Sequence, residues 1–449
     1  MPLSAPRPIP IPRTLSLFGL LLLGTLHAAT TPLKFHFSTD RAPTAPADSI
    51  AISAETIYSS ARGYGIEPVA PFAPGKPFYF TARVPQEGNY RVTVTLGDPT
   101  AVSLTTIKAE LRRLVVAAAI ATAAGETKRV SFIVNTRTPR IAAIQARASA
   151  PALAAGSVKL KAPRETVQEA WAWDDAITLE FGNTRPAVRA IEIEPVTVPT
   201  LFLLGDSTVC DQSKEPYNSW GQMLPRFFKP TLAVANHGES GETYRDSLAR
   251  RRLDKIVSAL RPGDWVMMQF GHNDQKQIAA KTGGPGTTYK EEIRKHVAAI
   301  RAHGGTPILV SPMERRRFTP EGKVELTLTD YANAARDTAR ELEIEFIDLH
   351  ALSQRLYAAL GPERSARAFA TAADGQIDNT HHNNYGSYEV ARCIVQALRD
   401  RQHPLAQFIA DDVGPFDPSR PDNPDTFAVP ASSLVTNERP LGDDANAKK

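Results

Sequence analysis

From Pro199 onward, short apolar runs alternate with longer helical stretches, and this alternation constrains the fold more than any other feature of the sequence. Continuous apolar runs are typical of buried parallel strands, and repeated strand–helix units require a parallel sheet with helices on both faces. The expected strands are residues 201–204, 232–235, 265–270, 307–310 and 345–349, and the expected helices are residues 220–228, 244–260, 289–302, 329–342 and 388–400. The pattern therefore predicts a doubly wound α/β domain over residues 199–403.

The preceding part of the chain has a different pattern. Short segments rich in β-branched and aromatic residues alternate between apolar and polar side chains, at residues 78–84, 90–96, 130–134, 158–160, 177–181 and 190–196. Such segments without long helices between them predict an antiparallel β-sandwich over residues 30–198. Trp171 and Trp173 are expected on one face of a strand, either as a platform that stacks on sugar rings or as part of the sandwich core.

The two ends of the chain are expected to lie outside these domains. Arg7 and Arg13 precede an apolar run over residues 15–26, and small residues follow, which is the order of a secretory signal. We therefore expect residues 1–29 to be removed and the mature protein to be secreted or periplasmic; the alternative is a signal that stays in the membrane as an anchor. Residues 404–449 are rich in proline and aspartate, which predicts an extended or disordered tail.

Composition narrows the class of partner. The formal net charge is +4 over 449 residues, too small an excess for the basic stripe that nucleic-acid binding requires. After signal removal, no apolar run is long enough to span a membrane as a helix.

Cys210 and Cys393 are the chain's two cysteines. In an exported protein they either form a disulfide or remain two buried thiols.

Four short polar segments follow or end the expected strands. They are GDST at 205–208, NHGESGET at 236–243, GHND at 271–274 and DNTH at 378–381. Because ligands bind at the carboxyl edge of an open α/β sheet, where its loops gather, we expect these segments to lie together at one site.

Together the segments supply what ester hydrolysis by a serine requires. The Ser207 hydroxyl must lose its proton to a neutral imidazole, for which His381 is the candidate. Asp378, three residues earlier, can orient this imidazole and stabilise its charged form. The developing oxyanion needs preorganised donors, and the backbone amides of Ser207 and Gly241 and the side-chain amide of Asn273 are of the right kind.

His382 beside His381 raises the alternative of a metal site. Adjacent histidines point in different directions, and no thiol or spaced histidine cluster accompanies this pair. We therefore expect no metal and no other cofactor.

In this chain order, GDST, the glycine of NHGESGET, GHND and DNTH resemble the four blocks of the SGNH (GDSL-type) hydrolases. Within that superfamily, residues 199–400 resemble the rhamnogalacturonan acetylesterases of pectin breakdown. The segments WDDAITLEF and PAVRAIEIEP also resemble an amino-terminal β domain found on such esterases in bacteria. The second block departs from the fungal pattern, because GET stands at 241–243 where fungal members commonly have Gly-Arg-Ser.

The resemblance implies a flavodoxin-like sheet, Ser207 as nucleophile, His381 as base and Asp378 as its partner. It also implies an oxyanion hole formed by Ser207, Gly241 and Asn273, and an acetyl-serine intermediate without a cofactor. The implied activity is removal of O-acetyl groups from acetylated plant cell-wall polysaccharide or its oligosaccharides, namely rhamnogalacturonan.

The substrate and the activity leave alternatives open. Arg315, Arg316 and Arg317 follow the fourth expected strand and either bind the carboxylates of a pectic backbone or form a solvated basic loop. The chain could instead be an SGNH esterase or lipase for another acyl ester, or a non-catalytic glycan-binding protein.

Overall fold

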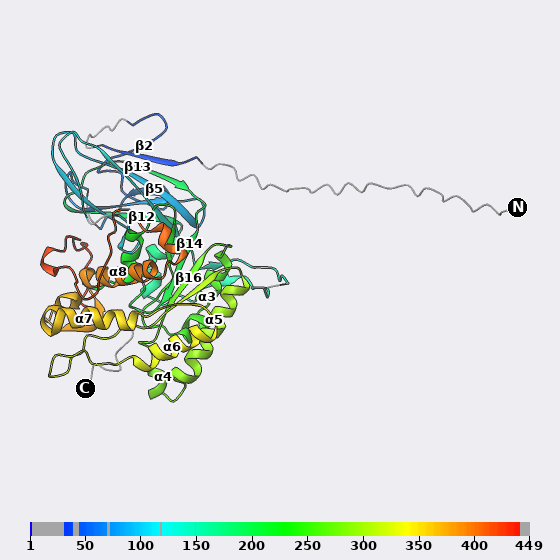
Figure 1. Ribbon diagram of the computed structural model, residues 1–449. Coiled ribbons are helices and arrows are strands. Elements are labelled where there is room, and N and C mark those ends of the chain that lie inside the picture. Colours follow the sequence, from blue (N-terminus) through cyan, green and yellow to red (C-terminus); the bar gives the residue numbers. More distant parts are fainter. Residues whose placement is uncertain (2–30, 39–44, 70–71, 117–118, 149, 441–449) are drawn as a thin grey trace. The chain divides into compact units, whose positions relative to one another are not determined.

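The computed structural model describes residues 1, 31–38, 45–69, 72–116, 119–148 and 150–440 (Figure 1). The expected signal over residues 1–29 therefore lies outside the described residues, apart from Met1. Within the described ranges, no helix has both the length and the apolar character needed to cross a membrane.

The described amino-terminal part contains two large sheets, besides one short pair of strands. One has the order β2 (Ile50–Ile52), β1 (Leu33–Phe37), β13 (Val188–Pro195), β5 (Gly88–Leu96) and β9 (Lys128–Thr136). The other has the order β3 (Tyr64–Ile66), β4 (Phe78–Arg83), β12 (Ala176–Arg185), β6 (Ser103–Ala109) and β7 (Arg113–Leu114), and β8 (Ile120–Thr122) pairs with β6. Neighbouring strands are antiparallel except β1 and β2.

Alternation along the strands explains why the two sheets share a core. In β5, Tyr90, Val92, Val94 and Leu96 are buried, while the residues between them are half-buried. Most of the buried apolar residues of the two sheets form a single cluster, as period-two patterning predicts. The strand expected at 158–160 is absent, because the local pairing is instead between β10 (Arg140–Ile141) and β11 (Gly156–Ser157).

Trp171 and Trp173 form neither the sugar-binding platform nor the part of the sandwich core that were the two alternatives for them. Trp173 does not lie in a strand but follows the short helix η2 (Ala170–Ala172), and it is buried. The Arg137 guanidinium lies 4.4 Å from the centre of its ring, and the His237 ring meets it edge-on. Trp173 is therefore neither an exposed sugar platform nor part of the cluster between the two sheets, and Trp171 packs partly buried beside it.

Residues 200–347 contribute a five-stranded parallel sheet. Its strands are β14 (Thr200–Gly205), β15 (Ala233–Asn236), β16 (Trp265–Gln269), β17 (Thr306–Val310) and β18 (Glu345–Ile347). Their spatial order is β15-β14-β16-β17-β18, with every neighbouring pair parallel. This is the order 2-1-3-4-5 of the flavodoxin-like fold, in which the ligand crevice lies where the winding reverses, between β14 and β16.

Helices cover both faces of the parallel sheet (Figure 1). On one face lie α1 (Trp220–Met223) with η3 (Leu224–Phe227), α7 (Leu349–Ser365) and α8 (Asn384–Asp400). On the other lie α2 (Tyr244–Ala249), α3 (Arg252–Ala259), η4 (Pro285–Tyr289), α5 (Lys290–Ala302) and α6 (Thr329–Glu341). The short helix α4 (Lys276–Ala279) follows the loop after β16.

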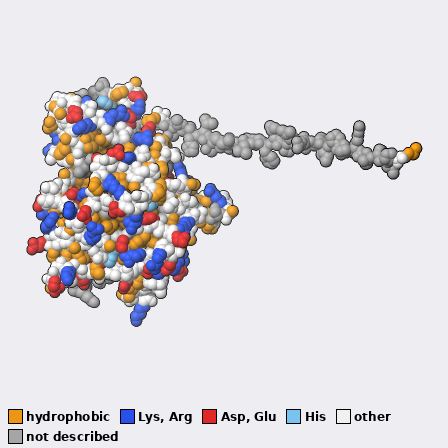
Figure 2. Space-filling model, viewed as in Figure 1, with side chains coloured by type: hydrophobic (Ala, Val, Ile, Leu, Met, Phe, Trp, Pro, Cys, Tyr) orange, Lys and Arg blue, Asp and Glu red, His pale blue; other side chains and the backbone are white. Residues whose placement is uncertain are grey.

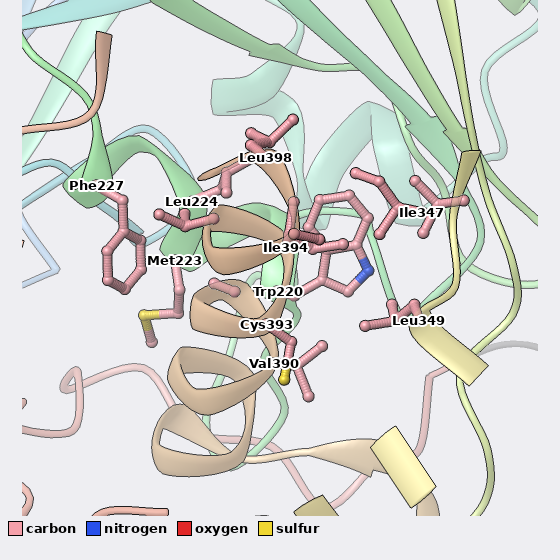
Figure 3. Close-up of a cluster of buried hydrophobic side chains, with 14 of the residues drawn as sticks. Trp220, Met223, Leu224, Phe227, Ile347, Leu349, Val390, Cys393, Ile394 and Leu398 are labelled. Atoms are coloured by element: carbon pink, nitrogen blue, oxygen red, sulfur yellow. The ribbon is translucent and has the colours of Figure 1, made fainter. Parts of the chain in front are cut away.

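Strand β14 shows how one sequence serves both faces. Leu201 and Leu203 pack into the cluster of α1, α7 and α8, whereas Phe202 and Leu204 pack into the cluster of α3, α5 and α6. Figure 3 shows part of the first cluster, where Trp220 lies against α8. Burial on both faces requires the uninterrupted apolar run from which the strand was predicted.

Residues 404–440 follow α8 and include only the short helices η6 (Pro404–Phe408) and η7 (Pro424–Thr426). Phe416 and Val429 nevertheless belong to the cluster around α8, and the Phe416 amide donates to Gln396 Oε1 of that helix at 2.9 Å. Farther on, Val435 pairs with Glu215 as an isolated bridge. The proline- and aspartate-rich composition gave no sign of these contacts.

A buried ion cluster joins the amino-terminal part to α3. Arg252, fully buried, donates two hydrogen bonds to the Glu165 carboxylate at 2.9 and 2.7 Å and one to Glu242 at 2.7 Å. Glu165 comes from the short helix η1 (Arg164–Gln168). Glu242 Oε1 also lies 3.6 Å from Lys161 Nζ and 3.6 Å from Arg250 Nε, whereas Glu165 forms its ion pair with Arg252. The link through Glu165 therefore depends on this one guanidinium.

We expect Arg252→Met to lower the free energy of unfolding by about 3–5 kcal/mol, because it removes the hydrogen-bonded counter-charge of the buried Glu165 carboxylate and one of the cations beside Glu242. Urea titration of the wild type and the variant measures this loss. As the control, Arg340→Met removes an exposed arginine paired with Asp337 and should change stability by less than about 0.5 kcal/mol. A similar small loss in both variants would mean that the buried cluster does not join the two parts.

Candidate active site

Ser207 lies in the turn that follows β14, at the point where the winding of the sheet reverses. The turn is held by Asp206, whose Oδ1 accepts from the Thr208 amide at 2.9 Å and from its hydroxyl at 2.7 Å. Gly205 is required because a Cβ there would lie 2.5 Å from the carbonyl oxygen of Gln269. The local sequence thus fixes the position of the Ser207 backbone.

The structure brings His381 and Asp378 to this serine. His381 Nε2 lies 2.9 Å from Ser207 Oγ, and His381 Nδ1 lies 2.9 Å from Asp378 Oδ2. A carboxylate can only accept, so Nδ1–H donates to Asp378 and Nε2 faces the serine as an acceptor. We refer to Ser207, His381 and Asp378 as the triad.

His381 and Asp378 were expected to follow a strand of the parallel sheet, but they do not. They lie within β20 (Ile377–His382), which forms a separate antiparallel pair with β19 (Phe369–Thr371). The Asp378 carboxylate also accepts from the backbone amides of Thr380 and His381 at 2.7 and 3.0 Å. These bonds fix the carboxylate within its own strand.

The charge state of Asp378 follows from its partners. Burial alone would raise its pKa, but the neighbouring His381 and the hydrogen bonds from His381 and Arg439 outweigh burial and hold the pKa well below its usual range. Arg439 donates from Nε to Oδ2 at 2.7 Å and from its terminal nitrogen to Oδ1 at 3.0 Å. The carboxylate is therefore ionised at neutral pH.

The segments that carry Gly241 and Asn273 lie beside the Ser207 turn. The Glu239 amide donates to the carbonyl of Gly205 at 2.9 Å, and Gly241 follows with a φ of +74°, a conformation that favours glycine. Asn273 Nδ2 donates to the carbonyl of Glu242 at 3.2 Å. The structure thus places all three expected oxyanion donors on adjoining loops.

His382 faces away from Ser207. Its Nε2 lies 2.9 Å from the hydroxyl of Tyr357, and burial lowers its pKa to about 3. Over the ranges that the structure describes, no three His, Cys, Asp or Glu side chains are grouped to hold a metal ion.

Cys210 and Cys393 do not form a disulfide in the structure. Both are buried free thiols, and burial raises the pKa of both.

The arginine triplet is not a uniform surface. Arg315 is fully buried and donates to Thr327 Oγ1 at 3.0 Å, which leaves it unable to reach a substrate carboxylate without rearrangement. Arg316 is half-buried and donates to Ser365 Oγ at 3.2 Å and to a backbone carbonyl. Arg317 is also half-buried, and its amide bonds the Arg315 carbonyl. The carboxylate-binding role expected for Arg315 is therefore not supported.

Residues 203–389 match the GDSL-like lipase/acylhydrolase family. Rhamnogalacturonan acetylesterase RhgT of Bacillus subtilis is 34% identical over 224 residues, which are 48% of this chain and 95% of that protein. The chain belongs to the GDSL-like lipase/acylhydrolase family. It is accordingly a carboxylic ester hydrolase.

Two further proteins of Bacillus subtilis are similar to this chain. The probable rhamnogalacturonan acetylesterase YesY of Bacillus subtilis is 30% identical, with 46% of this chain and 96% of that protein covered. The crystal structure of the Bacillus subtilis protein YxiM covers 83% of this chain and 99% of its own, at 24% identity and a TM-score of 0.45.

Sequence reasoning missed Arg439. It lies outside the region matched by the GDSL family model and 61 residues after its partner, in a segment whose composition suggested no packing. No motif or periodicity marks it, and only the path of residues 404–440 across the domain reveals its contact with the triad carboxylate.

Proposed function

We propose that this GDSL-family hydrolase removes O-acetyl groups from acetylated rhamnogalacturonan, with Ser207 as nucleophile, His381 as general base and Asp378 as its partner. The single observation that carries the mechanism is the 2.9 Å contact between His381 Nε2 and Ser207 Oγ, which is within the distance for direct proton transfer. The acetyl specificity and the glycan are supported by the names of the relatives at 30–34% identity.

The proposed reaction has two steps. In the first, Ser207 Oγ attacks the acetyl carbonyl, His381 Nε2 takes the hydroxyl proton, and the same proton passes to the departing sugar oxygen as its bond to the carbonyl carbon breaks. In the second, His381 takes a proton from water, which attacks the acetyl-serine, and the proton returns to Ser207 Oγ as acetate leaves. Asp378 stabilises the imidazolium in both steps.

We expect Asn273→Ala to lower kcat by about 100- to 1,000-fold with a smaller change in KM, because the lost amide would stabilise the oxyanion only as charge develops. Steady-state kinetics with an acetyl ester measure this. Asn333→Ala is the matched control, since this asparagine is exposed on α6, where its side chain accepts a hydrogen bond from Arg336, and the variant should retain wild-type rates. A loss confined to KM would contradict the oxyanion role.

The substrate is tested by release of acetate from a panel of esters. We expect acetylated rhamnogalacturonan to be hydrolysed with a higher kcat/KM than acetylated xylan, and acetyl esters to be preferred over octanoyl esters. A preference for octanoyl esters would favour a lipase for another acyl chain. Activity on none of them, with binding to the polysaccharide retained, would favour a glycan-binding protein.

The domain organisation and location are also part of the proposal. The shared core of the two amino-terminal sheets supports a β-sandwich domain over residues 30–198, followed by the hydrolase domain over 199–403 and a carboxy-terminal segment over 404–449. The charged and apolar order at the start of the chain supports export. Amino-terminal sequencing of exported protein should then begin near residue 30, and an intact Met1 would contradict cleavage.

A further inference from the structure

A pocket of about 280 Å³ is formed by three parts of the chain that are far apart in sequence. Residues 161–168 come from the amino-terminal part, residues 212–217 from the loop between β14 and α1, and residues 436–440 from the carboxy-terminal segment. The volume is near the lower end of the range for small-ligand sites. Two of the three parts lie outside the region that matches the GDSL family.

The pocket borders every member of the triad. Of its lining residues, Gln212 donates from Nε2 to the carbonyl of Ser207 at 2.8 Å. The ring of Tyr217 meets the ring of His381 edge-on at 6.0 Å, and Arg439 holds the Asp378 carboxylate. A group bound in this pocket would therefore lie one side chain away from the triad.

The cations that line the pocket are more exposed than the carboxylates with which they pair. Lys161 and Arg164 both lie within 4.0 Å of Glu239, but their side chains are 14% and 16% exposed and that of Glu239 is only 3% exposed. Arg439 and Asp378 repeat the arrangement, at 32% and 4%. Lys161 also pairs with Glu242, and Arg164 with Glu169, and these two carboxylates are 0% and 3% exposed. In every one of these contacts the cation is the member nearer to solvent, so cations and not carboxylates face the pocket.

Lys214 differs from these three cations. It lines the pocket and is half-buried, yet no ion pair or side-chain hydrogen bond links it to any residue that the structure describes. Glu438, the one acidic residue of the lining, is exposed and does not pair with it. A lysine that lines a pocket and has no counter-ion there can form an ion pair with an anionic ligand.

We infer that this pocket binds the carboxylate of a uronic acid unit of the substrate, with Lys214 as its ion-pair partner. The inference rests on the esterase function proposed above and adds a specificity site to it. The carboxylate is held beside the triad while the acetyl group of the same saccharide reaches Ser207. The arginines after β17, from which carboxylate binding was expected, do not line this pocket.

The test compares two forms of one substrate, an acetylated rhamnogalacturonan oligosaccharide with free uronates and the same oligosaccharide with its uronates methyl-esterified. We expect the wild type to prefer the free acid by about 10-fold or more in kcat/KM, mainly through KM, and added salt to reduce this preference. Lys214→Met should bring the ratio to within about twofold of unity, and Lys214→Arg should restore part of it. Lys295→Met, which removes an exposed lysine of α5, should leave the ratio at the wild-type value.

Three outcomes would overturn the inference. The wild type could hydrolyse both forms equally, the preference could survive in Lys214→Met, or Lys295→Met could remove it as effectively. Hydrolysis of p-nitrophenyl acetate by the wild type reports the proposed function separately. If the wild type does not hydrolyse p-nitrophenyl acetate, both the proposed function and this inference are wrong. If it hydrolyses p-nitrophenyl acetate but does not discriminate between the two oligosaccharides, only the carboxylate site is wrong.

Discussion

Ser207→Ala is expected to reduce kcat for acetate release by about 10⁵- to 10⁶-fold, because a nucleophile that forms the covalent intermediate has no substitute in the site. Neither His381 nor Asp378 can take over that role when the hydroxyl is removed, since the Asp378 carboxylate is held by His381 and Arg439 and the His381 ring is held by Asp378. Acetate release from acetylated rhamnogalacturonan, followed over hours at high enzyme concentration, measures the residual rate.

The same variant should remain folded. The Ser207 hydroxyl bonds His381 Nε2, and losing one such buried bond costs about 1 kcal/mol. The position of the backbone depends instead on Gly205 and Asp206, which are unchanged. A melting temperature close to that of the wild type, together with activity within tenfold of it, would exclude Ser207 as the nucleophile.

Asp378→Asn is expected to lower kcat by about 10⁴-fold. An asparagine amide can donate to His381 Nδ1, which would favour the tautomer whose Nε2 carries the proton and cannot accept one from Ser207. The change also leaves the Arg439 guanidinium without its carboxylate. Steady-state kinetics on an acetyl ester measure the loss.

Asp374→Asn is the matched control for this variant. Asp374 is exposed in the turn between β19 and β20 and accepts a hydrogen bond from the Gln376 amide. It carries the same charge four residues from Asp378, so its replacement should leave kcat within about twofold of wild type. Equal losses in the two variants would mean that charge near β20, and not the contact with His381, determines the rate.

The parallel sheet could be predicted because its strands are buried on both faces. Leu201 to Leu204 must be apolar at every position, which makes such a strand visible in a single sequence. The expected helix at 244–260 is instead divided into α2 and α3, because Arg251 takes a left-handed φ of +63°. Helix α7 was not predicted at all, since Gly361 and Pro362 within it indicate a break.

The residues of the triad could be predicted from the sequence, but the positions of several residues around them could not. Ser207, Asp378 and His381 stand in short motifs, and those motifs predicted which residues would meet. The burial of Arg315 could not be read from its sequence, since an arginine after a strand is more often solvated. Arg439 and Lys214 gain their positions only from long-range packing, which no local pattern records.

The small net charge predicted a surface without a basic stripe. Figure 2 shows basic and acidic side chains interspersed over the visible face. The positive charge of the pocket therefore comes from the layering of a few pairs, such as Arg164 over Glu239, and not from an excess of basic residues. The net charge of the chain does not reveal such an arrangement, because it counts charges without regard to which of them face solvent.

The central claim is that Ser207 is the nucleophile activated by His381, and labelling with a serine-directed phosphonate ester tests it most directly. The protein should take up one phosphonyl group, mapped to Ser207 by peptide mass spectrometry, in step with the loss of activity. The uptake should be slowed at least about 100-fold in His381→Ala, which lacks the general base. Full inactivation with the label on another residue, or equally fast uptake in His381→Ala, would contradict the account.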